Sequence, residues 1–256
     1  MTFADLHHAD KPLLLPNAWD VPSALAFLEA GFAAIATTSF GVASSHGHAD
    51  GARSTEAANL ALARALSHLP CHISIDIEDG YADDPDDVAA YVARLGVAGV
   101  NIEDSTAEML ISPQAHAAKV AAIKAHAPDV FVNARIDTYW LHQEETVDAT
   151  LERASAYVEA GADGVFVPGA ADPEILRELT GAIAAPLNTL VIPSLSLDAL
   201  GALGVRRVST GSLPYRAAIH AATAVASAIR DGRAIPASAP YADLQARLRH
   251  YEDTSP

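Results

Sequence analysis

Short apolar runs alternate with longer segments of mixed polarity along most of the chain. Each run covers four to six residues and is rich in Val, Ile, Leu and Ala, which is typical of strands buried on both faces of a parallel sheet. The runs lie at residues 11–15, 33–38, 73–77, 99–102, 130–134, 164–167, 187–191 and 207–210. After each run, start and stop signals such as proline and glycine predict a helix. These helices are expected at residues 23–30, 55–68, 85–95, 112–127, 144–160, 173–180, 196–203 and 217–229.

This order of elements predicts a single (β/α)8 barrel of the TIM type. Four segments, beginning at Ala30, Leu95, Ala160 and Leu203, repeat the order of helix, glycine and strand expected at the bottom of such a barrel. A doubly wound open sheet is the alternative, but no Gly-rich phosphate-binding sequence follows the first strand to favour it. We expect residues 1–256 to form one domain, with 231–256 as a short C-terminal helical tail.

The composition is that of a large acidic domain. The chain has 256 residues, half of them hydrophobic, and its formal charge is −16 because 32 acidic residues oppose 16 basic ones. Such a charge repels a phosphate backbone, so no nucleic-acid partner is expected. Cys71 is the only cysteine, no signal-peptide pattern opens the chain, and no apolar run approaches the ~20 residues of a membrane span. We expect a cytoplasmic protein without a membrane partner.

Acidic residues gather at the end of the third predicted strand, in the sequence Ile-Ser-Ile-Asp-Ile-Glu-Asp-Gly at residues 73–80. Asp76 and Glu78 are two residues apart, so the period of a strand would place both carboxylates on the same side. Two carboxylates that close repel each other unless a cation lies between them. Helix capping is the alternative interpretation of any single acidic strand end.

Other predicted strands carry polar side chains at or just after their ends, namely Asn17 and Asp20, Thr38 and Ser39, Glu103, and Arg135 and Asp137, and Asn188 lies within the seventh strand. In a barrel the carboxyl ends of the strands form the working face, so these side chains are expected to share one site. Acidic oxygen ligands suit a hard cation, Mg²⁺ first and Mn²⁺ as an alternative. Arg135 would then supply a two-pronged positive group for the carboxylate of a small anionic substrate.

Two further motifs have less specific interpretations. Residues 39–53 are rich in Gly, Ser and His and are too numerous for a routine connection, so a functional loop is expected there. His46 and His48 have the spacing of a zinc-binding pair, but no third nitrogen or sulfur ligand is near, and a flexible polar lid is preferred. Arg206 and Arg207 begin the eighth strand at the bottom of the barrel, where a structural or subunit contact is expected.

With these residues placed, the chain resembles the isocitrate lyase/phosphoenolpyruvate mutase superfamily. The matching segments occur in family order: Leu15–Asp20, Thr38–Ala43 leading to Asp50-Gly51, Asp76–Tyr81, Asn101–Asp104, Asn133–Asp137 and Gly161–Phe166. The resemblance implies a Mg²⁺-assisted enzyme that makes or breaks a C–C or P–C bond beside a 2-keto acid group, through an enolate. It also implies a homodimer or homotetramer.

The resemblance also implies roles for matching residues. Asp76 would bind the metal directly, and Glu78, Glu103 and Asp50 would lie near it or hold its waters. The backbone of Thr38, Ser39 and Phe40 would hold the substrate carboxylate, Arg135 would clamp it, and Asn188 would line the pocket. The candidate catalytic residues are therefore Arg135, Asp50 and Glu103.

The departures from the superfamily pattern narrow the expected reaction. Isocitrate and methylisocitrate lyases carry a catalytic Cys in a Lys-Lys/Arg-Cys-Gly-His loop after the fourth strand, and here residues 105–110 contain neither Cys nor His. The mutases have a longer lid there, whereas this chain continues almost directly into the helix at Ser112. We expect a Mg²⁺-dependent lyase of small 2-keto or 2-hydroxy dicarboxylic acids. Phosphoenolpyruvate or phosphonopyruvate chemistry and a non-catalytic keto-acid-binding barrel are the alternatives.

Overall fold

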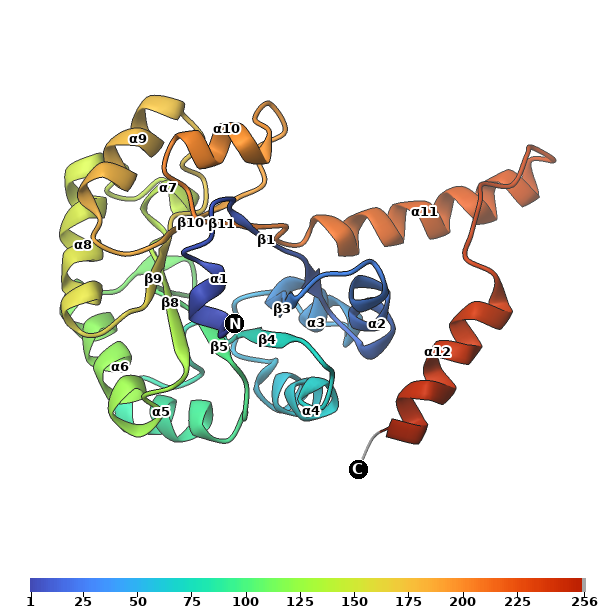
Figure 1. Cartoon of the computed structure of the whole chain (residues 1–256), viewed down its shortest axis with the longest axis horizontal. Helices are drawn as coiled ribbons and strands as arrows, with labels where there is room; N and C mark the ends of the chain where they lie inside the picture. Colours follow the sequence, from blue (N-terminus) through green and yellow to red (C-terminus); the bar gives the residue numbers. More distant parts are fainter. Residues whose placement is uncertain (255–256) are drawn as a thin grey trace.

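A parallel sheet, closed into a barrel and ringed by helices, forms the body of the molecule (Figure 1). This computed structural model describes residues 1–254. The barrel strands pair in the order β1-β11-β10-β9-β8-β5-β4-β3-β2. Their bounds are β1 (Leu13–Leu15), β2 (Asn17–Ala18), β3 (Ala34–Thr37), β4 (His72–Asp76), β5 (Gly99–Glu103), β8 (Phe131–Arg135), β9 (Gly164–Phe166), β10 (Leu187–Leu190) and β11 (Arg207–Ser209).

The barrel closes through one interrupted strand. β1 pairs with β11 and β2 pairs with β3, and only Pro16 separates β1 from β2. Proline has no N–H to donate, but its carbonyl still accepts a bond of 2.8 Å from the N–H of Ala36. β1 and β2 therefore act as one strand. The predicted (β/α)8 barrel is confirmed, with the eight strands at the expected places.

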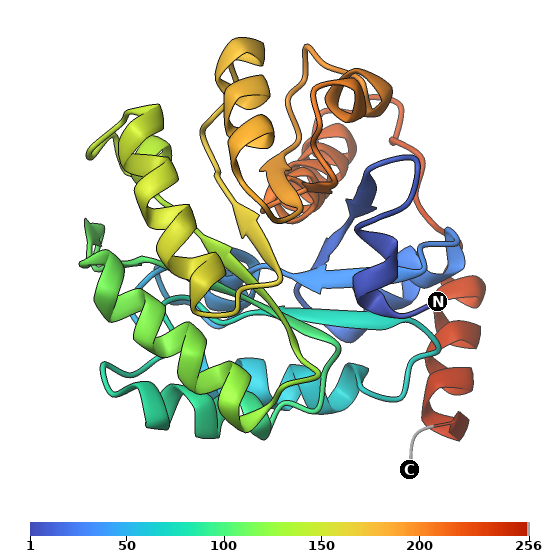
Figure 2. The ribbon, with the colours of Figure 1, turned by 60° about the vertical axis from the view of Figure 1, so that its left-hand side comes forward.

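The helices lie outside the strands, as Figure 2 shows from a second direction. Those of the barrel ring are α2 (Val21–Glu29), α4 (Glu56–Leu66), α5 (Pro85–Ala93), α6 (Pro113–His126), α8 (Val147–Glu159), α9 (Pro173–Ala182) and α10 (Leu197–Ala202), and α11 (Leu213–Arg230) follows the last barrel strand. Side-chain caps fix several starts: the carboxylate of Asp84 accepts from the N–H of Asp86, and that of Asp20 accepts from the N–H of Ser23. Asp20 is thus a helix cap and not a residue of the pocket, which agrees with the alternative interpretation of a charged strand end.

The main hydrophobic core lies between the strands and the ring of helices, and a smaller one fills the lower barrel. The smaller core includes Phe3, Leu15 and Phe131. Phe3 comes from a short helix that the sequence pattern did not predict, α1 (Phe3–Leu6), and its ring lies so close to Gly99 that a Cβ there would meet it at 2.7 Å. This aromatic plug closes the amino end of the barrel and leaves the carboxyl end for the site.

Three segments differ from the sequence-based expectations. Residues 39–53, expected to be a loop, begin with a helix, α3 (Ser39–Ser45). Residues 105–110 form a small hairpin of β6 (Ser105–Thr106) and β7 (Met109–Leu110), where an almost direct entry into the next helix was expected. A one-turn helix, α7 (Thr138–Leu141), also precedes α8.

The last two helices leave the barrel. α11 extends away from it with only Ala228 buried, and α12 (Tyr241–Thr254) turns back (Figure 1). Arg247 of α12 forms an ion pair with Glu29 at the end of α2. Within residues 1–254, no helix is both long and apolar enough to cross a membrane.

Candidate active site

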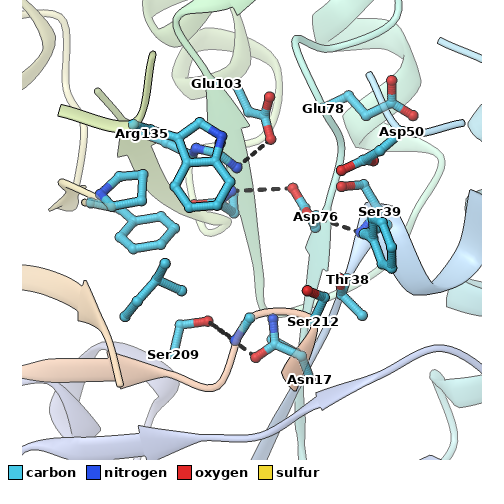
Figure 3. A pocket seen from close by; sticks show the side chains of 18 of the residues that line it. Asn17, Thr38, Ser39, Asp50, Asp76, Glu78, Glu103, Arg135, Ser209 and Ser212 are labelled. Atoms are coloured by element: carbon cyan, nitrogen blue, oxygen red, sulfur yellow. Dashed lines mark hydrogen bonds and ion pairs between the residues drawn. The ribbon is translucent and has the colours of Figure 1, made fainter. Parts of the chain in front are cut away.

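A cavity of about 490 Å³ opens at the carboxyl ends of the barrel strands. Most of the predicted site residues line it: Thr38, Ser39, Phe40, Asp50, Asp76, Glu78, Glu103 and Arg135. Figure 3 shows the four carboxylates arranged around one common space, with Arg135 on the side of Glu103. The expectation that charged strand ends share one pocket holds for these residues.

Asp76 is the last residue of β4 and lies at the centre of the acidic group. One of its carboxylate oxygens accepts the backbone N–H of Ser39 at 2.9 Å, and the other accepts the side-chain amide of Asn101 at 3.2 Å. These bonds fix the carboxylate across the pocket while leaving lone pairs on both oxygens, since an ionised carboxylate has about four acceptor positions.

Glu78 reaches the pocket in a different way from the one expected. β4 ends at Asp76, and Glu78 has a backbone φ of +49°, so the period of a strand does not extend to it. Its carboxylate accepts the hydroxyl of Thr55 and, at 2.9 Å, the backbone N–H of Arg53. Burial raises the pKa of Glu78. The hydrogen bonds from Thr55 and Arg53 oppose that rise, and the charges of Asp76 and Asp50 add to it.

Glu103 and Arg135 end two adjacent strands and form an ion pair of 2.5 Å. Arg135 also donates from Nε to Asp137 at 2.6 Å. Burial raises the pKa of Glu103 well above its ordinary range, and the charge of Arg135 only partly offsets this. Burial alone would lower the pKa of Arg135, but Asp137 and Glu103 outweigh it and keep the guanidinium charged.

Asp50 comes from the loop that follows α3 and faces the acidic group from the side (Figure 3). Burial of its carboxyl group raises the pKa of Asp50, and the nearby charge of Asp76 raises it further. Ser39 and Arg135 act in the opposite direction. Three carboxyl groups of the pocket, those of Asp50, Glu78 and Glu103, therefore hold protons more readily than free carboxyl groups do.

The chemistry of these donors fits a hydrated divalent cation better than a closed metal cage. Within the described residues, no three Asp, Glu, His or Cys side chains form a group that could hold a metal by themselves. Mg²⁺ usually keeps several waters and binds one or two carboxylates. Asp76, with Glu78 and Glu103 facing the same space, offers that arrangement. His46 donates from Nδ1 to the carbonyl of Val42 at 3.0 Å at the end of α3, and neither His46 nor His48 lines the pocket.

The structure places two of the expected substrate contacts differently from the sequence-based expectation. Asn188 does not line the pocket: it is the second residue of β10, lies inside the barrel and is 1% exposed. The expected backbone cradle is also largely occupied, because the N–H of Thr38 bonds to the carbonyl of Ala18 at 3.1 Å and that of Ser39 bonds to Asp76. The side chains of Thr38 and Ser39 still line the pocket.

The sequence analysis missed several lining residues. The β6–β7 hairpin contributes Ser105, Thr106 and Glu108, and α7 contributes Trp140, whose ring lies 5.7 Å from the guanidinium carbon of Arg135. Arg207, expected to make a structural or subunit contact at the bottom of the barrel, also lines the pocket. No local pattern signals these contacts, because they depend on strand register and on a two-residue turn.

The hairpin is held from both sides. Thr106 donates to the carboxylate of Asp79 at 2.6 Å, and Asp79 also forms an ion pair with Arg53 from the loop before α4. From the turn after α7, the side chain of Gln143 accepts the N–H of Leu110 at 3.1 Å and donates to the carbonyl of Glu108 at 2.8 Å. These bonds make the hairpin a short, anchored wall of the pocket.

The fold and the acidic pocket together define a barrel enzyme of the phosphoenolpyruvate mutase/isocitrate lyase class. The chain belongs to the phosphoenolpyruvate phosphomutase family, whose model matches residues 3–230. An uncharacterized protein of Mycobacterium tuberculosis is 60% identical over 253 residues, covering 99% of this chain and 98% of that protein.

Relatives with named activities are more distant. A 2-methylisocitrate lyase of Halalkalibacterium halodurans is 31% identical over 198 residues, covering 72% of this chain and 65% of the lyase. A proposed phosphonomutase from Burkholderia cenocepacia, known from a crystal structure, is 37% identical with a TM-score of 0.83, covering 88% of this chain and 97% of that one. The family thus contains lyases and mutases, and its membership makes this protein an enzyme of the superfamily.

Proposed function

We propose that the protein is a Mg²⁺-dependent lyase that cleaves a C–C bond in a small 2-keto or 2-hydroxy dicarboxylic acid through an enolate. The observation that carries this proposal is the convergence of Asp50, Asp76, Glu78 and Glu103 with Arg135 on one open pocket. Four carboxylates in one cavity repel an anionic substrate unless a cation is added. An oxaloacetate decarboxylase of Pseudomonas fluorescens, 36% identical over half of this chain, is consistent with this substrate class.

The acidic residues would hold the metal, with Asp76 as the direct ligand and Glu78 and Glu103 as further ligands or acceptors of its waters. Mn²⁺ would fit the same oxygen donors. When bound, the metal would supply the positive charge that stabilises an enolate oxygen.

The remaining side chains bind, orient and move protons. Arg135 is held in place by Glu103 and Asp137, and its unused N–H groups would bind the substrate carboxylate. Thr38, Ser39 and Phe40 would form the wall beside that carboxylate. Asp50 and Glu103, whose pKa values are raised, are the groups suited to hold a proton and return it to the enolate.

Two alternatives follow from particular features. The structural likeness to the Burkholderia cenocepacia protein keeps phosphonopyruvate or phosphoenolpyruvate chemistry as a second reaction for the same pocket. The hairpin at residues 105–110 carries no Cys or His that could serve as an acid or base. If no turnover is found, this absence favours a barrel that only binds a keto acid.

The proposed assembly is a homodimer or homotetramer. α11 supports it, because Leu213, Ile219 and Ile229 are 45–60% exposed on a helix that leaves the barrel. Light scattering on the purified protein tests this, and a monomer at micromolar concentration would contradict it.

The proposed reaction is tested by incubating the full chain with oxaloacetate, 2-oxoglutarate, phosphonopyruvate and a set of 2-hydroxy acids, with and without Mg²⁺. Release of pyruvate or glyoxylate that requires Mg²⁺ is expected. Release from phosphonopyruvate alone would favour the second reaction. Thermal stabilisation by a keto acid without any release would favour the binding protein.

A further inference from the structure

Arg207 points into the barrel from its lower end. A continuous line of paired residues crosses the sheet: Glu103, Arg135, Phe166, Asn188 and Arg207. Residues paired across parallel strands project to the same face, so Arg207 points inward as Arg135 does. The line starts at the last residue of β5 and ends at the first residue of β11, because the strands of a barrel are tilted. Arg207 therefore lies deeper in the barrel than Arg135.

The guanidinium of Arg207 has no partner in the part of the chain that the structure describes. The residue is 2% exposed, its Nε and Nη1 atoms are buried without a hydrogen bond, and it forms no ion pair within residues 1–254. Arg135, by contrast, is held by two carboxylates. Burial lowers the pKa of Arg207 to about 9, and only the more distant charge of Asp76 opposes this. A buried cation without a partner costs stability, which points to a missing anion.

The floor of the pocket is built around this cation. Arg207 lines the pocket together with Ser74, whose buried hydroxyl also has no partner. Asn188, the neighbour of Arg207 in register, has both amide atoms buried and unpaired, so it offers Arg207 no partner either, and it does not line the pocket itself. Small side chains, those of Ala36 and Ser209, also line the pocket and leave room for a ligand. The guanidinium of Arg207 and the hydroxyl of Ser74 are together donors suited to an anionic oxygen group.

We propose that Arg207 binds a second anionic group of the substrate, a carboxylate or phosphonate, at the floor of the pocket. This rests on the proposed function, and it assigns the preferred substrates to acids with two anionic groups. Arg135 and the acidic residues act on the first group at the mouth, and Arg207 holds the second below them. A free inorganic anion or buried water at Arg207 are the competing occupants.

The test uses two inert four-carbon acids, succinate and butyrate, which differ by one carboxylate. Their affinities are measured by calorimetry in Mg²⁺ for the full-length wild type, Arg207→Met and the control Arg206→Met, whose residue is partly exposed and precedes β11. We expect the wild type and Arg206→Met to bind succinate at least tenfold more tightly than butyrate. Arg207→Met is expected to lose that preference and keep its affinity for butyrate.

Urea unfolding shows whether the variant is folded. Without ligand, Arg207→Met is expected to be at least as stable as the wild type, because a buried unpaired charge is replaced by an apolar chain of similar length. A large loss of stability would show a structural cation and overturn the proposal. An unchanged preference for succinate in Arg207→Met would also overturn the proposal. Stabilisation of the wild type by chloride or phosphate, without a preference for succinate over butyrate, would overturn it as well.

These outcomes separate this proposal from the lyase proposal. Turnover of a keto acid with an unchanged succinate preference in Arg207→Met would leave the lyase proposal standing and overturn the role of Arg207. A preference lost in Arg207→Met, without turnover of any acid, would sustain the anion subsite and overturn the lyase.

Discussion

Arg135 shows how single side chains set the character of the pocket. It is the last residue of β8, its guanidinium contacts Glu103 and Asp137, and its guanidinium carbon lies 5.7 Å from the ring of Trp140 and 5.9 Å from that of Phe166. A guanidinium can satisfy two carboxylates and still present further N–H groups to a ligand, whereas an ammonium is a compact point charge. The geometry around position 135 therefore requires Arg rather than any cation.

Arg135→Lys is expected to raise the KM for the keto acid at least tenfold and to lower the free energy of unfolding by about 1–3 kcal/mol, because one carboxylate loses its charged partner. Steady-state kinetics and urea unfolding measure the two effects. Arg177→Lys, an exposed substitution on α9, is the control. An unchanged KM beside reduced stability would show that Arg135 is only structural.

At the scale of elements, the β6–β7 hairpin replaces the long lid expected in mutases. Its turn residues, Ala107 and Glu108, both have positive φ values, of +49° and +61°. Neither residue type signals such a turn, which is why residues 105–110 gave no hairpin prediction. Gln143 holds the hairpin from the turn between α7 and α8, a contact that only the folded chain reveals.

Gln143→Ala is expected to release the hairpin, because the N–H of Leu110 and the carbonyl of Glu108 both lose their partner. Hydrogen exchange at Leu110 should become at least tenfold faster, and kcat/KM should fall several-fold because the hairpin lines the pocket. Gln114→Ala, at an exposed position of α6, should change neither quantity. Unchanged exchange at Leu110 would show that other contacts, such as Thr106 with Asp79, are sufficient.

At the scale of the whole molecule, the order of elements was predictable and the inside of the barrel was not. Apolar runs and glycine stops are local signals, so the strands and most helices lie where the sequence places them. The direction of Asn188 and Arg207 depends on how far each strand is shifted against its neighbours. Asn188 was expected to line the pocket from within the seventh strand, but it is only the second residue of β10, which places it deep in the barrel.

Buried histidines make the stability of the whole fold dependent on pH. Burial lowers the pKa of His7 and His116 from 6.5 to about 3. Between pH 6.5 and pH 3, each of these histidines binds a proton in the unfolded chain but not in the folded chain. The contribution of each neutral histidine to the free energy of unfolding is therefore complete above pH 6.5 and is lost as the pH falls toward 3. Each histidine would contribute a slope of about 1.4 kcal/mol per pH unit.

His116→Phe keeps a ring against Tyr157, whose centroid lies 4.4 Å from that of His116, and removes the titrating group. Between pH 6.5 and 5 the variant is expected to lose about 2 kcal/mol less stability than the wild type. Urea unfolding at the two pH values measures the difference, and His8→Gln, at an exposed position, is expected to behave as the wild type. Equal losses in His116→Phe and wild type would show that His116 is already protonated or solvated in the fold.

The central claim is that the acidic pocket works through a divalent cation held by Asp76. The most direct measurement is a Mg²⁺ titration of the wild type and Asp76→Asn, by calorimetry and by product release from the best keto acid. Asn keeps the size and one acceptor oxygen but removes the charge, so we expect a loss of Mg²⁺ affinity of at least tenfold together with loss of Mg²⁺-dependent release. Mg²⁺ affinity and release equal to those of the wild type would contradict the claim.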